Sequence, residues 1–101
     1  MTERTLRERV LFKLATVIDP ETRVDVLRMR LIEDLVVDED SGVVHYRFHP
    51  SSPLCPLAVP LALGIRRAVA DVDGVTAQEM EVVGYVGADE LNRLLQETRE
   101  G

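Results

Sequence analysis

The segment that decides the fold runs from Val43 to Leu57 and reads VVHYRFHPSSPLCPL. From Val44 to His49 apolar and polar side chains alternate, which is typical of a β-strand with one buried face. Three prolines follow within 50–56, and because proline has no N–H to donate to a sheet, the chain must leave the sheet there. The segment therefore predicts a strand, a loop and the beginning of a helix.

A second strand and a helix are predicted before this segment. Residues 31–37 are rich in leucine, isoleucine and valine, and the acidic, glycine-containing turn at 38–42 would join them to the next strand as a hairpin. Thr5 and Glu8 fit a capping box at the start of the helix, and Pro20 would end it. Its apolar stripe has helical spacing and comprises Leu6, Val10, Leu11, Leu14, Val17 and Ile18.

The chain after the proline-rich loop predicts a helix, a strand and a last helix. The first of these helices either begins near Pro60 or is kinked there. Residues 75–83 are strand-like and residues 88–98 are helical, whereas residues 23–30 fit either a short helix or an extended segment. The buried stripe of the first helix consists of Leu57, Leu61, Ile65, Ala68, Val69 and Val72. The side chains expected to face inward from the last helix are Leu91, Leu94 and Leu95.

This order of elements predicts an α+β fold, a small α/β sandwich. The order is helix, strand, strand, helix, strand, helix, and it suits a three-stranded mixed sheet with helices packed on it. A right-handed crossover through the middle helix would make the second and third strands parallel. With 101 residues, the chain is expected to form a single domain over 1–101.

Composition and charge exclude several classes of protein. The chain has 18 acidic and 12 basic residues, a net charge of −6, which counts against a nucleic-acid-binding protein. No apolar run approaches the roughly 20 residues that span a membrane, and the charged first residues do not form a signal peptide. A single cysteine, Cys55, cannot form a disulfide framework. We therefore expect a cytoplasmic protein without membrane or nucleic-acid partners.

Cys55 is the first candidate for chemistry. It stands at the expected start of a helix, where free N–H groups and the helix dipole stabilise a thiolate. One interpretation is a reactive or metal-binding thiol, held in place by the prolines on either side. The other is a small buried apolar residue in a tight turn. Position alone does not separate the two.

Acidic residues and histidines supply the other candidates. Asp19 and Glu21 flank a proline, so they are either a ligand pair or general base, or the cap of the turn that begins there. His45 and His49 share one face of the predicted strand, and His49 could bind a metal together with Cys55 and a carboxylate. No close ligand pair and no G-x-S-x-G motif is present, so no catalytic residue is assigned and no enzyme is expected. A thiol-dependent activity of Cys55 is the remaining alternative, although no base is evident beside it in the sequence.

The arrangement of these motifs resembles the metal–sulfur cluster biosynthesis family, also called domain of unknown function fifty-nine. The resemblance rests on Asp19-Pro20-Glu21 after a helix, on Ser51-Ser52-Pro53-Leu54-Cys55-Pro56-Leu57 after the second strand, and on Asp73-Gly74-Val75 before the third. It covers about residues 6–83 and leaves the last helix outside. The family includes SufT-type proteins, the PaaD subunit of phenylacetate degradation and a component of the eukaryotic cytosolic iron–sulfur assembly machinery.

The resemblance implies an accessory role in iron–sulfur cluster assembly. Cys55 matches the family's cysteine, and Asp19 and Glu21 match its acidic corner, so these residues would contact a cluster, a carrier or an apo-target. The implied cofactor is an iron–sulfur cluster or transient iron at an intermolecular site. Since clusters ordinarily take four cysteines, a homodimer, a partner protein or a small thiol would supply the other ligands. The alternative is a PaaD-like accessory subunit or interaction module in which Cys55 is structural.

The sequence departs from the family pattern just before the first strand. The family has a stretch resembling D-L-G-L-V, where this chain has Arg28-Met29-Arg30-Leu31-Ile32. An acid and a glycine are thus replaced by two arginines. We expect the charge and backbone shape of this loop to differ from those of other members.

Overall fold

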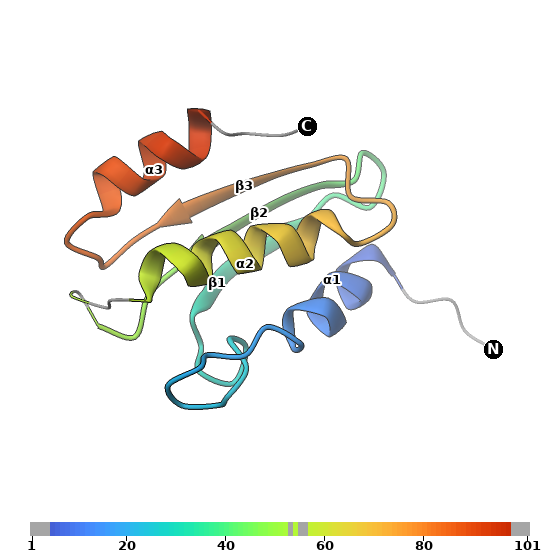
Figure 1. Ribbon diagram of the computed structural model, residues 1–101. Helices are drawn as coiled ribbons and strands as arrows, with labels where there is room; N and C mark the ends of the chain where they lie inside the picture. Colours follow the sequence, from blue (N-terminus) through green and yellow to red (C-terminus); the bar gives the residue numbers. More distant parts are fainter. Residues whose placement is uncertain (1–4, 53, 55–56, 98–101) are drawn as a thin grey trace.

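A computed structural model describes residues 5–52, 54 and 57–97 of the chain (Figure 1). Its elements follow the predicted order and confirm the α+β fold. Among the described residues, no helix is long and apolar enough to cross a bilayer. The elements are α1 (Leu6–Leu14), β1 (Ile32–Val37), β2 (Val43–Phe48), α2 (Ala58–Ala70), β3 (Ala77–Val82) and α3 (Ala88–Glu97).

The sheet has the mixed topology that the sequence predicts. β2 is central, with β1 antiparallel on one side and β3 parallel on the other. In the hairpin turn, the N–H groups of Ser41 and Asp40 donate to the Asp38 carboxylate at 3.2 and 3.0 Å. These bonds hold the pKa of Asp38 below its ordinary value. The acidic turn predicted at 38–42 is therefore stabilised by the side chain of its first residue, Asp38.

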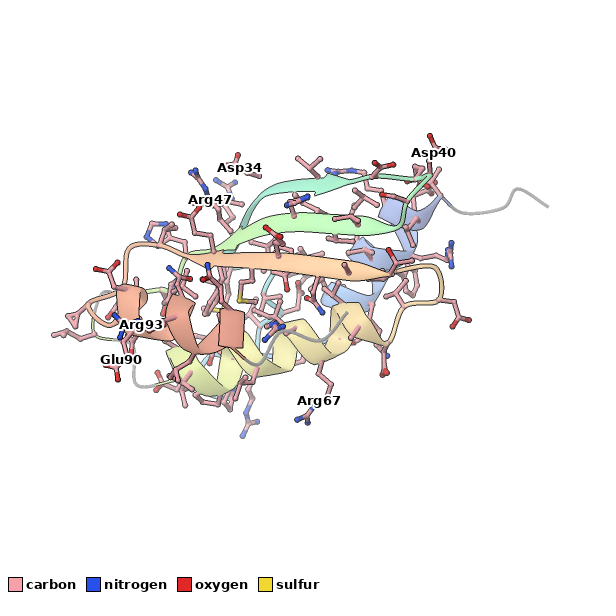
Figure 2. The ribbon with its side chains drawn as sticks, turned by 90° about the horizontal axis from the view of Figure 1, so that it is seen from above. Asp34, Asp40, Arg47, Arg67, Glu90 and Arg93 are labelled. Atoms are coloured by element: carbon pink, nitrogen blue, oxygen red, sulfur yellow. The ribbon has the colours of Figure 1, made fainter. Side chains whose placement is uncertain are left out.

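One face of the sheet is covered by helices and the other is open. Val44, Tyr46 and Phe48 point from β2 into the core beneath α1 and α2. On the open face, Arg47 lies 3.5 Å from Asp34 on β1 and 3.1 Å from Glu81 on β3 (Figure 2). The third helix, α3, lies along the outer edge of β3 (Figure 1).

A buried polar chain ties the sheet to α2. The Tyr46 hydroxyl donates to the Gln78 side chain at 2.7 Å, and the Gln78 amide donates to the carbonyl of Arg66 at 2.7 Å. Burial raises the pKa of Tyr46 above its ordinary value. Because the Tyr46 hydroxyl and the Gln78 amide both have hydrogen-bond partners, these bonds offset the desolvation penalty of burying the two side chains.

The first helix has its predicted start but an earlier end. Thr5 and Glu8 form the predicted capping box. The helix ends at Leu14, before Val17 and Ile18, which the sequence pattern had included. Val17 instead accepts a hydrogen bond from Val26 at 3.0 Å, so this stretch pairs with the loop that follows. The run of β-branched residues 16–18 favours this extended conformation over a helix.

Two other expectations concern α2 and α3. The second helix begins at Ala58, so Pro60 lies in its first turn, where a missing N–H costs no hydrogen bond. The expectation that Leu94 faces inward is wrong: its side chain is 49% exposed, whereas Leu91 and Leu95 are buried. Leu91 and Leu95 are four residues apart, and this narrow stripe suffices for a helix at the edge of the sheet.

Residues 23–30 form a series of turns, so they are neither the short helix nor the extended segment that the sequence allowed. The Asp25 carboxylate accepts the N–H groups of Leu27 and Arg28 at 3.1 and 3.0 Å. Arg30 then adopts a left-handed backbone conformation with φ of 60°. A residue with a Cβ is strained there and glycine is not. The loop therefore places an arginine in a backbone conformation that favours glycine.

Arg30→Gly is expected to stabilise the fold. Removing the left-handed strain of about 1–2 kcal/mol outweighs the extra freedom of glycine in the unfolded chain, roughly 0.5–1 kcal/mol. The net gain should be about 0.5–1 kcal/mol in urea denaturation. Arg28→Gly is the matched control, because Arg28 lies in the same turns without a positive φ and should lose stability. Equal effects of the two substitutions would contradict this interpretation.

Candidate functional site

The acidic corner and the start of α2 face each other across an apolar groove. The groove has a volume of about 200 Å³. It lies between the chain that leaves α1 and the first two turns of α2. We call it the corner groove, and its lining residues are Val17, Ile18, Pro20, Leu57, Pro60, Leu61 and Gly64. It therefore brings together two of the motifs that the sequence singles out, the corner and the end of the proline-rich loop.

Asp19 builds the corner with its backbone and its side chain. Asp19 is 3% exposed, and its carboxylate accepts the N–H of Glu21 at 2.8 Å. The N–H of Asp19 donates to Val24 at 3.0 Å, and its carbonyl accepts the N–H of Arg23 at 2.7 Å. This is the turn-capping role that its place before a proline favours. In contrast, Glu21 is exposed, so it is the acid of the corner that is open to a partner or an ion.

The charges at the start of α2 favour an anion there. No acidic residue lies in its first turn, and no side chain caps it at Leu57. The free N–H groups and the dipole of a helix start favour negative charge, a thiolate included. Cys55 itself lies outside the described residues. Its position at the start of the helix and its contact with Asp19 and Glu21 therefore stay predictions.

The two histidines project from the open face of the sheet, opposite α1 and α2. His49 lies 3.3 Å from Glu33, and His45 lies 3.8 Å from Glu79. The ring of His49 also packs on Gly84, where a Cβ would come within 2.3 Å of Nε2. Within the described part of the chain, no three ligand-type side chains gather around a potential metal position. The metal-binding prediction for His49 with Cys55 stays untested.

Sequence reasoning missed the corner groove. Its walls come from residues 17–20 and 57–64, which are far apart along the chain and meet only because α1 and α2 pack together. The available signal was Gly64, a glycine in the middle of a strongly helical segment. Such a glycine usually has a packing or functional reason.

Comparison with known proteins identifies the group to which this molecule is similar. A family model described as iron–sulfur cluster assembly protein matches residues 7–82. The chain is 35% identical over 91 residues to an uncharacterised protein of Methanocaldococcus jannaschii, covering 90% of this chain and 95% of that protein. It is also 35% identical over 81 residues to the Fe-S protein maturation auxiliary factor YitW of Bacillus subtilis, covering 80% and 78%.

Solved structures share the fold. A domain of unknown function DUF59 from Bacillus anthracis superposes with a TM-score of 0.70 at 21% identity, covering 93% of both chains. A conserved hypothetical protein from Thermotoga maritima superposes with a TM-score of 0.65 at 26% identity, covering 96% of both chains. The similarity thus extends over nearly the whole chain in each case.

Proposed function

Because this chain belongs to the family of iron–sulfur cluster assembly proteins, we propose that it is a non-catalytic accessory factor for the maturation of iron–sulfur proteins. It acts through the Cys55 thiolate on a cluster, a carrier or an apo-target. The cluster or iron is its cargo. Protein partners of the assembly process, or apo-proteins, receive or deliver that cargo. A reducing compartment such as the cytoplasm keeps the single thiol available.

The observation that carries the proposal is the groove shared by Pro20 and Leu57. The exposed acid Glu21 directly follows Pro20 along the chain, and Cys55 precedes Leu57 by two residues. The uncapped start of α2 lies at the same place and favours a thiolate over a thiol. A Cys55 thiolate within reach of the Glu21 carboxylate would offer two ligand atoms to iron. Because a cluster takes about four ligands, the rest come from a second copy, a partner or a small thiol.

Reconstitution with iron and sulfide tests the proposal. Wild type, incubated anaerobically with both, should develop visible charge-transfer absorption and retain iron and acid-labile sulfide. Cys55→Ser should lose most of both, since serine is a poor ligand for a cluster. Asp19→Asn is the matched control, because the amide oxygen can still accept the Glu21 N–H and the buried turn should survive. If Cys55→Ser takes up as much iron as wild type, the proposal is wrong.

The apolar corner groove favours a second candidate function. A PaaD-like accessory subunit, or an interaction module, would use the groove to hold a partner while Cys55 has only a structural role. Its signature is partner binding without metal that survives Cys55→Ala. Reconstitution separates the two functions, because an interaction module would retain no cluster in either wild type or the variant.

A further inference from the structure

Gly64 lies in the interior of α2 without a packing reason. Glycine in a helix interior costs about 1 kcal/mol relative to alanine. A Cβ built on Gly64 meets no described atom within 4 Å, and its backbone has no positive φ. Neither a close contact nor the helix geometry therefore calls for glycine here. What the missing side chain does provide is space, because Gly64 lines the corner groove.

The corner groove is apolar and remains partly open to solvent. Ile18, on its outer wall, is 48% exposed although it is a large aliphatic residue. On the outer surface of α2 beside it, Val59 and Leu63 are 41% and 46% exposed. The volume of about 200 Å³ is below the roughly 300–1,000 Å³ of small-molecule sites. Its size and lining suit one bulky apolar side chain of a bound peptide better than a cofactor.

Basic residues follow both walls of the groove along the chain. Arg23 follows Pro20 by three residues, and Arg67 follows Gly64 by three residues on the same face of α2. Both are exposed, and Figure 2 shows Arg67 pointing away from the helix into solvent. Within the described part of the chain, neither guanidinium is joined to a carboxylate. Arg23 also keeps a left-handed backbone, with φ of 60°, that would suit glycine better.

Local charge decides what such a groove attracts. The whole chain carries −6, but at physiological salt charges beyond about 8 Å are largely screened. The charged residues that follow the walls of the groove along the chain include the basic Arg23 and Arg67 and the exposed acids Glu21 and Asp71. Asp71 already lies 3.7 Å from Lys13, so Glu21 is the acid that opposes the two arginines. Two arginines favour carboxylates. A segment that carries carboxylates beside an apolar anchor therefore complements both the lining of the groove and these two arginines.

We propose that the corner groove docks an extended peptide segment of a partner protein, in which a bulky apolar residue is flanked by aspartate or glutamate. The apolar side chain enters beside Gly64, and the carboxylates pair with Arg23 and Arg67. This inference rests on the proposed function only in taking the partner to be a client or carrier of iron–sulfur assembly. Docking itself requires neither iron nor Cys55.

Peptide selection under metal-free, reducing conditions tests the proposal. Random twelve-residue peptides are displayed on phage and selected on the immobilised full-length chain. The recovered peptides should combine leucine, isoleucine, phenylalanine or methionine with neighbouring aspartate or glutamate. Synthetic, fluorescently labelled versions then give dissociation constants by anisotropy. Their binding should weaken as salt is raised, since exposed ion pairs are screened.

The Gly64 variants separate docking from folding. Gly64→Gln should raise the melting temperature, because glutamine is the better helix former, and yet bind the selected peptides at least tenfold more weakly. Gly64→Ala should also stabilise the fold but leave most of the binding, since it adds only one carbon. Ala70→Gln introduces the same side chain at an exposed position in the last turn of α2, outside the groove. As the control, it should leave peptide binding unchanged. Arg23→Ser with Arg67→Ser should weaken binding at least fivefold and reduce its salt dependence.

Three results would overturn the docking proposal. They are a failure to select any peptide, a selected set without acidic residues, and undiminished binding by Gly64→Gln. The outcome is independent of the reconstitution experiment. A chain that binds these peptides but retains no iron would contradict the cluster role of Cys55 while supporting the docking groove.

Discussion

Phe48→Ala is expected to lower the free energy of unfolding by about 3–5 kcal/mol, the range for a fully buried aromatic side chain. Phe48 is 0% exposed and is one of the largest side chains of the core. It lies on the central strand, between Ile32 on β1 and Val82 on β3. A loss of this size is a large fraction of the 5–15 kcal/mol that stabilises a typical domain. The variant should be largely unfolded or poorly expressed near body temperature.

Phe12→Ala is the matched control for this substitution. It removes the same side chain from α1, where Phe12 is 62% exposed. The expected loss is below about 1 kcal/mol, since little apolar area returns to water. Urea denaturation monitored by circular dichroism measures both variants. Similar losses for the two would show that the core is not centred on β2.

The regular elements were the predictable part of the fold. Alternation over 43–49 indicated which face of β2 is buried, and the acidic turn at 38–42 indicated that β1 is its hairpin partner. Both patterns involve residues that are neighbours along the chain, so they can be recognised from the sequence alone. Leu94 was not predictable in the same way. It belongs to the same helical pattern as Leu91, and only the position of α3 at the sheet edge decides which leucines are covered.

The boundaries that failed depend on distant partners. The pattern of α1 extended to Ile18, but the structure ends the helix at Leu14 because residues 17–18 pair with the loop around Val26. The loop itself was ambiguous, since its turns are held by the Asp25 side chain and by a left-handed Arg30. Neither feature can be recognised from residue propensities. A left-handed arginine is also unexpected, because residues with a Cβ disfavour that conformation.

The candidate site was predictable as a set of motifs but not as a shape. For Asp19 the sequence already offered the capping role that the structure shows. That Pro20 and Leu57 line one groove follows from the packing of α1 on α2, which no local pattern encodes. Cys55 was selected as a candidate site residue because of its position in the sequence and because of the family resemblance. Its role is a matter for the reconstitution experiment.

The outer edge of β3 is closed by a side chain of α3. The amide of Asn92 accepts the N–H of Val82 at 2.7 Å and donates to its carbonyl at 3.0 Å, as a neighbouring strand would do. Unpaired strand edges are templates for association with other chains. Since this part of the edge is occupied, a partner that docks by adding a strand is disfavoured there.

Asn92→Ala is therefore expected to open this edge. Two hydrogen bonds to partly buried backbone groups are lost, at about 1 kcal/mol each, and each 1.4 kcal/mol is a factor of ten. Hydrogen exchange at the Val82 amide should accelerate roughly thirtyfold. At high concentration the variant should also self-associate in sedimentation velocity. Gln96→Ala, at an exposed position on the same helix, should do neither. If the Val82 amide keeps its wild-type exchange rate in Asn92→Ala, the edge is protected by the packing of Leu91 and Leu95 alone, and the amide of Asn92 is dispensable.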